Sequence, residues 1–249
     1  MAFAFAEPTL KKPSDLNVEN LLLYEDNHLL VLNKPGGVLV QGDASGDVSL
    51  LELAKAYLKK TYRKPGNVYL GLVHRLDRVT SGVVVFARTS KAASRLSKAF
   101  REKKIQKIYL ALVHGIPPEK EGTLKDKLGW NSSQRRAFLT PAGKEASLYW
   151  QRKSSFQKRA LLLLKPLTGR KHQIRIQLAA RGHPIVGDFK YGSRQRIAGG
   201  RAICLHAWRL MLPHPTKKEI LLLEAPLPDY WLEIFPPLAG NFFPKRFAF

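Results

Sequence analysis

A stretch of nine residues combines one carboxylate with two guanidinium groups. It lies between the apolar runs 68–73 and 83–87 and reads His74-Arg75-Leu76-Asp77-Arg78-Val79-Thr80-Ser81-Gly82. Both runs have the length of a strand, so we expect Asp77 at a strand-to-strand connection. The neighbouring cations favour an ionised carboxylate, which suits chemistry on a phosphodiester polymer. The local spacing alone favours a structural role over a functional one, namely an ion pair of Asp77 with Arg75 or Arg78.

The overall charge restricts the class of partner. The 249 residues include 42 Lys plus Arg against 19 Asp plus Glu, a net charge of +23. Such a chain attracts nucleic acid or an anionic membrane. A membrane span needs ~20 consecutive apolar residues, and cationic membrane binders gather their charge on an amphipathic helix. The sequence has neither pattern, so we expect a nucleic acid as the partner and no membrane.

The composition also predicts the domain organisation. An apolar content of 45% can fill an ordinary core, and no repeat or low-complexity linker divides the chain. We therefore expect a single domain over 19–249, preceded by a mobile N-terminal arm over 1–18. The lone cysteine, Cys204, excludes an intramolecular disulfide and a Cys-based zinc site. It is typical of a core residue and fits a reducing, cytoplasmic setting.

Apolar periodicity predicts more strands than helices. Asp47 or Ser49 is expected to cap a first helix through Leu58, and Ser90 to cap a second. The segment 115–145 is expected to form a long loop or a hairpin that could reach over a substrate. Hairpin-length connections predict an α+β fold with a largely antiparallel sheet. The expected strands are 21–24, 28–32, 68–73, 83–88, 105–113, 147–152, 159–164, 203–212 and 219–224, and the later helices are 91–103 and 172–181.

A second basic cluster changes the interpretation of Asp77. It reads Gly169-Arg170-Lys171-His172-Gln173-Ile174-Arg175. With 74–82, this cluster resembles the RluA-type family of RNA pseudouridine synthases, and the resemblance extends over about 20–225. It implies the pseudouridine synthase fold, a mixed, largely antiparallel sheet flanked by helices and loops with a central catalytic cleft.

The resemblance assigns roles to four residues. Asp77 matches the family's catalytic aspartate, and Arg175 matches the arginine that pairs with it. The stretch 107–115 matches a family pattern that makes Tyr109 the tyrosine packed on the target base. Arg75 matches an arginine that can enter the space left by a flipped base, although a backbone or phosphate contact is the alternative.

Three positions depart from the family pattern. Lys171 replaces a common Thr, Gln177 stands where many members have His, and Leu148 stands where Thr is expected. These departures bear on subfamily and substrate. Many members carry an amino-terminal RNA-binding domain of the S4 type, and we expect this chain to lack it.

The implied reaction needs neither metal nor cofactor. It breaks the bond from ribose C1′ to uracil N1, turns the base and joins C1′ to C5. The carboxylate of Asp77 could attack C1′, attack uracil C6 or remove the 2′-proton, and the sequence leaves these routes open. Four histidines lie far apart without an acidic partner at ligand spacing, so no metal site is expected; they are His74, His172, His183 and His206.

Paired cations elsewhere suit a groove that follows an RNA backbone. Any single pair could equally be solvated surface. The candidates for backbone contacts are Lys104, Arg135, Arg136, Arg170 and Lys171.

We therefore expect a monomeric, cytoplasmic enzyme that isomerises specific uridines in structured ribosomal or transfer RNA. One alternative is a non-catalytic RNA-binding or ribosome-assembly factor that retains the fold. Asp77 argues against it, because pure binding has little use for a carboxylate facing phosphate. A metal-free nuclease or glycosidase is the other, and it would usually need a second acid or a histidine base beside the first carboxylate.

Overall fold

The computed structural model describes residues 8–239, which include part of the expected N-terminal arm. Residues 1–7 of that arm lie outside the described residues. Residues 8–18 contain the 3-10 helix Pro13–Asp15 and lead into a second one, Val18–Leu21, which begins with the buried Val18.

Eleven strands among the described residues form one sheet. Its main path runs β1-β2-β4-β10-β5-β9-β8-β6-β7, while β3 pairs with β4 and β11 with β10. The pair of β4 and β10 is parallel, and the other pairs are antiparallel, as the sequence predicted. The strands are β1 Leu22–Glu25, β2 Leu29–Lys34, β3 Gly71–Leu72, β4 Ser81–Ala87, β5 Gln106–His114, β6 Glu121–Asn131, β7 Arg136–Leu139, β8 Lys144–Phe156, β9 Arg159–Pro166, β10 Leu205–Pro213 and β11 Ile220–Glu224.

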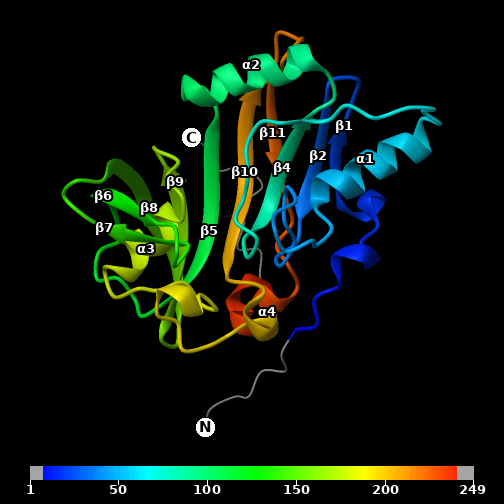
Figure 1. The fold of residues 1–249 in the computed structure, drawn as a ribbon. Coiled ribbons are helices and arrows are strands. Elements are labelled where there is room, and N and C mark those ends of the chain that lie inside the picture. Colours follow the sequence, from blue (N-terminus) through cyan, green and yellow to red (C-terminus); the bar gives the residue numbers. More distant parts are fainter. Residues whose placement is uncertain (1–7, 240–249) are drawn as a thin grey trace.

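The strands β1, β2, β4 and β10 are called here the first half of the sheet, and β9, β8, β6 and β7 the second half, with β5 between them. Helices cover both faces of the first half. Figure 1 shows α2 across the top of the strands and α1 beside β2. The helices are α1 Leu50–Thr61, α2 Ser90–Arg101, α3 Gln173–Ala179 and α4 Tyr230–Ile234. Ser49 caps α1 through a reciprocal box with Glu52, as its position predicted. The predicted cap of α2 was wrong by one residue, because Thr89, not Ser90, accepts from the amide of Ala92.

Alternating side chains of β2 reach two separate cores. Leu30 and Leu32 pack in one cluster with Leu50 of α1. Leu29 and Val31 pack in another with Leu96 of α2. Successive residues of a strand point to opposite faces, so β2 is buried on both sides. This explains why it reads as a continuous apolar run rather than as an alternation.

Two segments differ in detail from their predicted form. The segment 115–145 forms the hairpin option, because β6 and β7 pair with each other and β6 also pairs with β8. The apolar run 68–73 contributes only the two residues of β3 to the sheet. Its buried residues Val68 and Leu70 instead pack in the cluster of α1.

Gly82 makes the close approach of β4 to β10 possible, and this predicts a large cost for any side chain. Its φ is +117°, and an added Cβ would lie 2.6 Å from the amide nitrogen of Ala207. We expect Gly82→Ala to lower the free energy of unfolding by about 2–4 kcal/mol in urea denaturation. Gly66→Ala is the matched control, since an added Cβ there meets nothing within 4 Å. Equal stabilities of the two variants would contradict this view of the β4–β10 contact.

Candidate active site

The segment 73–80, called here the Asp77 loop, connects β3 to β4 and is fixed by backbone hydrogen bonds. The amide of Thr80 donates to the carbonyl of Asp77 at 3.0 Å, which closes a turn. The amide of Gly37 donates to the carbonyl of Arg78 at 2.8 Å, and that of Ile203 to Val79 at 3.2 Å. Segments before and after the loop in sequence therefore hold it in place.

The fully buried Lys34 also holds the Asp77 loop in place. The ammonium group of Lys34 donates to the carbonyls of Pro35 at 2.9 Å, Val38 at 2.8 Å and Arg78 at 3.1 Å. Burial lowers its pKa to about 7, although the charge of Asp77 acts in the opposite direction. Lys34 thus joins the end of β2 to the Asp77 loop.

His74 is a structural residue of the loop. Its Nε2 accepts a hydrogen bond from the amide of Val85 at 2.9 Å, and its ring stacks on Phe100 with centroids 4.9 Å apart. Burial lowers the pKa of His74 to about 4, so the ring is neutral and can accept. The pairing holds the start of the loop against β4.

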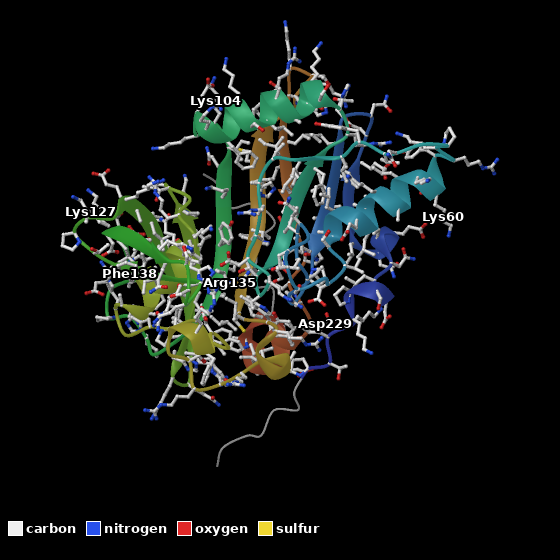
Figure 2. The ribbon with its side chains drawn as sticks, viewed as in Figure 1. Lys60, Lys104, Lys127, Arg135, Phe138 and Asp229 are labelled. Atoms are coloured by element: carbon white, nitrogen blue, oxygen red, sulfur yellow. The ribbon has the colours of Figure 1, made fainter. Side chains whose placement is uncertain are left out.

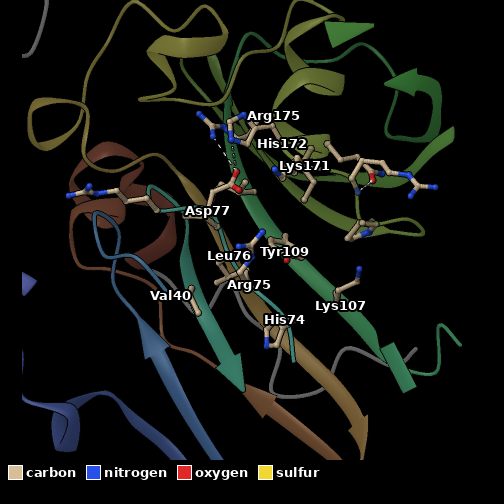
Figure 3. Close-up of a pocket in the computed structure, with 18 of the residues that line it drawn as sticks. Val40, His74, Arg75, Leu76, Asp77, Lys107, Tyr109, Lys171, His172 and Arg175 are labelled. Carbon is tan, nitrogen blue, oxygen red and sulfur yellow. Dashed lines mark hydrogen bonds and ion pairs between the residues drawn. The ribbon is translucent and has the colours of Figure 1, made fainter. Parts of the chain in front are cut away.

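Asp77 and Arg175, which lie 98 positions apart in sequence, meet in the structure as the resemblance implied. Nη1 of Arg175 lies 3.2 Å from Oδ2 of Asp77 (Figure 3). The side chain of Asp77 is 32% exposed, whereas that of Arg175 is 6% exposed. The carboxylate is thus accessible, and its cationic partner is buried behind it.

A second carboxylate fixes the guanidinium of Arg175. Asp188, which is buried, accepts from Nε at 2.7 Å and from Nη2 at 2.8 Å. This bidentate geometry leaves Nη1 for Asp77. Burial opposes the charge of Arg175, but the two carboxylates outweigh it and raise its pKa. The arginine is therefore a permanent cation with its plane oriented by Asp188.

His172 also faces Asp77. Its Nε2 lies 3.6 Å from Oδ2 of Asp77, and its Nδ1 lies 2.8 Å from the hydroxyl of Tyr191. The residue precedes α3 with φ 54° and ψ 19°, a left-handed conformation that costs a non-glycine residue roughly 1–3 kcal/mol. The backbone is thus strained at the residue that points this ring toward the carboxylate.

Asp77 lies in a cavity of about 1290 Å³ with Tyr109 and Arg75 in its wall. In Figure 3, Tyr109 on β5 and Arg75 lie on the side of Asp77 opposite Arg175 and His172. Arg75 is exposed, and Tyr109 is half-buried. Burial, with the charge of Asp77, raises the pKa of Tyr109, so its phenol stays protonated. The four residues assigned by resemblance thus line one cavity.

The five candidate backbone contacts do not all reach this cavity. Arg135, Arg170 and Lys171 line it, and Lys171 Nζ lies 4.6 Å from the ring centre of Trp130. Arg136 lies over the ring of Tyr191, outside the residues lining the cavity. Figure 2 shows Lys104 at the end of α2, where it pairs with Glu102 at 2.8 Å, also outside the lining.

The three departures from the family pattern lie outside the contacts of Asp77. Leu148 is buried in the core of the second half of the sheet. Gln177 is buried, and its amide nitrogen donates to Asp126 at 2.7 Å. Of the three, only Lys171 lines the cavity, where it lies beside Trp130. It is therefore the departure most able to affect substrate binding.

Sequence reasoning missed three residues of this site: Lys34, Asp188 and His172. Asp188 lies in a turn between Gly187 and Gly192, both of which have positive φ. Asp188 stands two residues after the apolar 184–186, and no short-range pattern around it indicates its partner. Among residues 8–239, no group of three or more His, Cys, Asp or Glu could hold a metal ion. No helix of the described chain is long and apolar enough to cross a membrane.

The contrast between two arginine pairs gives a stability prediction. Arg175→Gln leaves Asp188 buried without its cation, so we expect a loss of about 3–5 kcal/mol in the free energy of unfolding. Arg181→Gln removes a pair of similar length, 2.7 Å to Asp126, whose arginine is 35% exposed. Its expected loss is below ~1 kcal/mol. Urea denaturation of both variants tests this, and similar losses would contradict the proposed importance of burial.

Comparison with known proteins identifies a family for this site. Residues 28–180 match the model of the RNA pseudouridylate synthase family. Ribosomal large subunit pseudouridine synthase C of Buchnera aphidicola subsp. Baizongia pistaciae is 37% identical over 220 residues, which cover 85% of this chain and 68% of the relative. Its counterpart in Escherichia coli O157:H7 is 36% identical over 234 residues, covering 89% and 70%.

Solved structures give the same family. Human RNA pseudouridylate synthase domain containing 4 superposes with a TM-score of 0.75 at 26% identity, covering 89% of this chain and 94% of that one. Human RNA pseudouridylate synthase domain containing 1 gives 0.66 at 31% identity, covering 85% of each. The expected pseudouridine synthase fold is therefore confirmed. The chain belongs to the RNA pseudouridylate synthase family, and it is an enzyme that isomerises uridine to pseudouridine in RNA.

Proposed function

We propose that this enzyme modifies uridine in the RNA of the large ribosomal subunit, with Asp77 as the reacting carboxylate. The choice of RNA is supported by relatives named as ribosomal large subunit pseudouridine synthases that are 36–37% identical over 85–89% of the chain. Of the two RNA classes expected from the sequence, ribosomal RNA is thus favoured over transfer RNA.

One observation carries the assignment of Asp77. Its Oδ2 lies 3.2 Å from a buried guanidinium, while the carboxylate remains partly exposed to a cavity of about 1290 Å³. Pockets for small ligands usually measure ~300–1,000 Å³, so this space suits a flipped nucleotide together with its neighbours. An oriented anion facing such a space can attack the substrate or remove a proton from it.

Tyr109 and Arg75 support the flipped base in this proposal. The ring of Tyr109 gives an aromatic surface in the cavity wall, and stacking of a base contributes ~1–3 kcal/mol. Extrusion of a base costs a few kcal/mol, so stacking offsets much of that cost. Arg75 is exposed beside this space and can fill the gap left in the RNA.

The cationic rim binds the RNA backbone in the same proposal. Arg135, Arg170 and Lys171 line the cavity, and Trp130 offers a ring beside Lys171. Phosphate contacts of this kind release counterions, so the affinity decreases as salt is added. Lys104 and Arg136 lie outside the lining and are assigned to flanking RNA.

We further propose that residues 19–249 act as one domain and that the enzyme works in the cytoplasm as a monomer without metal or cofactor. One sheet that runs from Leu22 to Glu224 supports the single domain. The lone Cys204, which is buried, fits a reducing compartment. A carboxylate that reacts as an anion makes a Lewis acid unnecessary for this isomerisation.

Replacement of Asp77 tests the activity and the target together. Asp77→Asn removes the anion but keeps the shape, so we expect RNA binding to persist and turnover to be lost. Pseudouridine-specific mapping of total RNA from cells lacking the gene should show a lost site in large-subunit RNA. The native protein should restore it, and Asp77→Asn should not.

Asp229→Asn is the matched control, because Asp229 is exposed and does not line the cavity. It should restore the site fully. A lost site in transfer RNA instead would overturn the proposed target, and full activity of Asp77→Asn would overturn the proposed role of Asp77.

Tyr109 gives a separate test of base stacking. Tyr109→Phe keeps the aromatic ring on which the base stacks, so it should keep turnover close to that of the native enzyme. Tyr109→Leu should lose roughly 5- to 150-fold, because the aromatic surface is gone. Single-turnover rates on a uridine-containing RNA measure both. Tyr149→Leu, on β8 and away from the cavity, should leave the rate unchanged. A rate for Tyr109→Phe as low as for Tyr109→Leu would show that the hydroxyl takes part.

A further inference from the structure

The imidazole of His172, which lies in the cavity wall, packs between the rings of Trp130 and Tyr191. Trp130 meets it edge-on at 5.2 Å with an interplanar angle of 87°, and Tyr191 meets it at 5.6 Å with 82°. His172 lines the cavity that contains Asp77. The ring therefore has one orientation, and each nitrogen has a defined neighbour.

The neighbours of the ring fix its tautomer. The hydroxyl oxygen of Tyr191 accepts from the amide of Ala137 at 2.8 Å and lies 2.8 Å from Nδ1 of His172. Nδ1 is the only acceptor within hydrogen-bond distance of this hydroxyl among the described residues, so the hydroxyl donates to it. The proton of a neutral ring then lies on Nε2. This places an N–H group, rather than a lone pair, toward the carboxylate of Asp77.

The ring is neutral at physiological pH. Burial lowers the pKa of His172 to about 4, although the charge of Asp77 opposes this shift. The cations Arg175 and Lys190 also disfavour an imidazolium, while Asp188 favours one. His172 thus offers Asp77 a dipole without adding a third positive charge to the site.

Two donors converge on the same oxygen of Asp77. Nη1 of Arg175 lies 3.2 Å from Oδ2, and Nε2 of His172 lies 3.6 Å from it. The second distance is slightly too long for a hydrogen bond, and contacts of this kind often tighten only when the substrate is bound. Within residues 8–239, no hydrogen bond or ion pair reaches Oδ1. The two oxygens of the carboxylate are therefore not equivalent.

We propose that His172 is a positioning residue that, as the Nε2–H tautomer set by Tyr191, holds Oδ2 of Asp77 together with Arg175 and leaves Oδ1 to react. The left-handed backbone of His172 supports this role, because strain of this kind persists where the surroundings require one orientation. The inference rests on the proposed role of Asp77 as the reacting carboxylate.

Two substitutions of His172 separate positioning from packing. Phenylalanine fills the space between the two rings but has no N–H group, so His172→Phe should lower the single-turnover rate by roughly 10- to 100-fold, as expected for a lost hydrogen bond to a charged group. RNA affinity should stay near that of the native enzyme. Glutamine carries an N–H donor near the position of Nε2, so His172→Gln should recover most of the rate despite its poorer fit.

His183→Gln is the matched control for this pair. His183 is half-buried and lies near a backbone carbonyl, with Nδ1 3.1 Å from the oxygen of His114, but it does not line the cavity. This variant should keep the native rate. A loss of thermal stability common to His172→Phe, His172→Gln and His183→Gln can be measured and does not affect the test. The test compares the rate of His172→Phe with the rate of His172→Gln.

Nitrogen NMR of the histidine side chains tests the tautomer directly. The native spectrum should show the protonated nitrogen of His172 at Nε2 between pH 6 and 8. Tyr191→Phe removes the donor to Nδ1, so the spectrum should change to a mixture of both tautomers, with a fall in rate smaller than that of His172→Phe.

Several outcomes would overturn the inference. These are a native rate in His172→Phe, equal losses in His172→Phe and His172→Gln, or a native tautomer with the proton on Nδ1. The failure of the proposed function is a different result, namely an Asp77→Asn variant that still turns over. An inactive Asp77→Asn beside a fully active His172→Phe would reject the role of His172 alone.

Discussion

The buried charge of Arg175 is the constraint on which the arrangement of the site depends. A guanidinium that is 6% exposed is unfavourable unless its donors are matched by acceptors. Asp188 satisfies two of these donors, and Asp77 satisfies a third. A buried pair of this kind adds little net stability, but it tolerates few geometries. The position of α3, the turn around Asp188 and the Asp77 loop are thereby fixed relative to one another.

The sheet supplies the frame in which this charge is buried. Tyr109 lies on β5, which lies between the two halves of the sheet. Its side chain packs against the cores of both halves. The Asp77 loop comes from the first half, and α3 comes from the second. The cavity is therefore formed where the two halves meet, and its two walls carry different groups. One wall contributes the carboxylate, and the other contributes the cation and the imidazole.

The features that could be predicted from the sequence are local or belong to a recognisable pattern. The capping role of Ser49 and the apolar runs of β2 and β4 follow from short-range physical rules. The meeting of Asp77 and Arg175 followed from the resemblance. Asp188 and Lys34 could not be found in this way, because their roles consist of contacts that only the folded chain creates. The cap of α2 was misplaced because Thr89 and Ser90 are equally suitable by type.

The parallel pairing of β4 with β10 brings residues that lie far apart in the sequence into contact. Ser81 pairs with His206, and β10 separates β4 from β5 in the sheet. During translation, β4 and β5 emerge long before the strand that joins them. Contacts of such high sequence separation slow folding, since a long segment must be closed before they form. A nascent chain that ends before β10 therefore has an Asp77 loop without its supporting neighbour. Premature termination should yield an inactive fragment rather than a partly active enzyme.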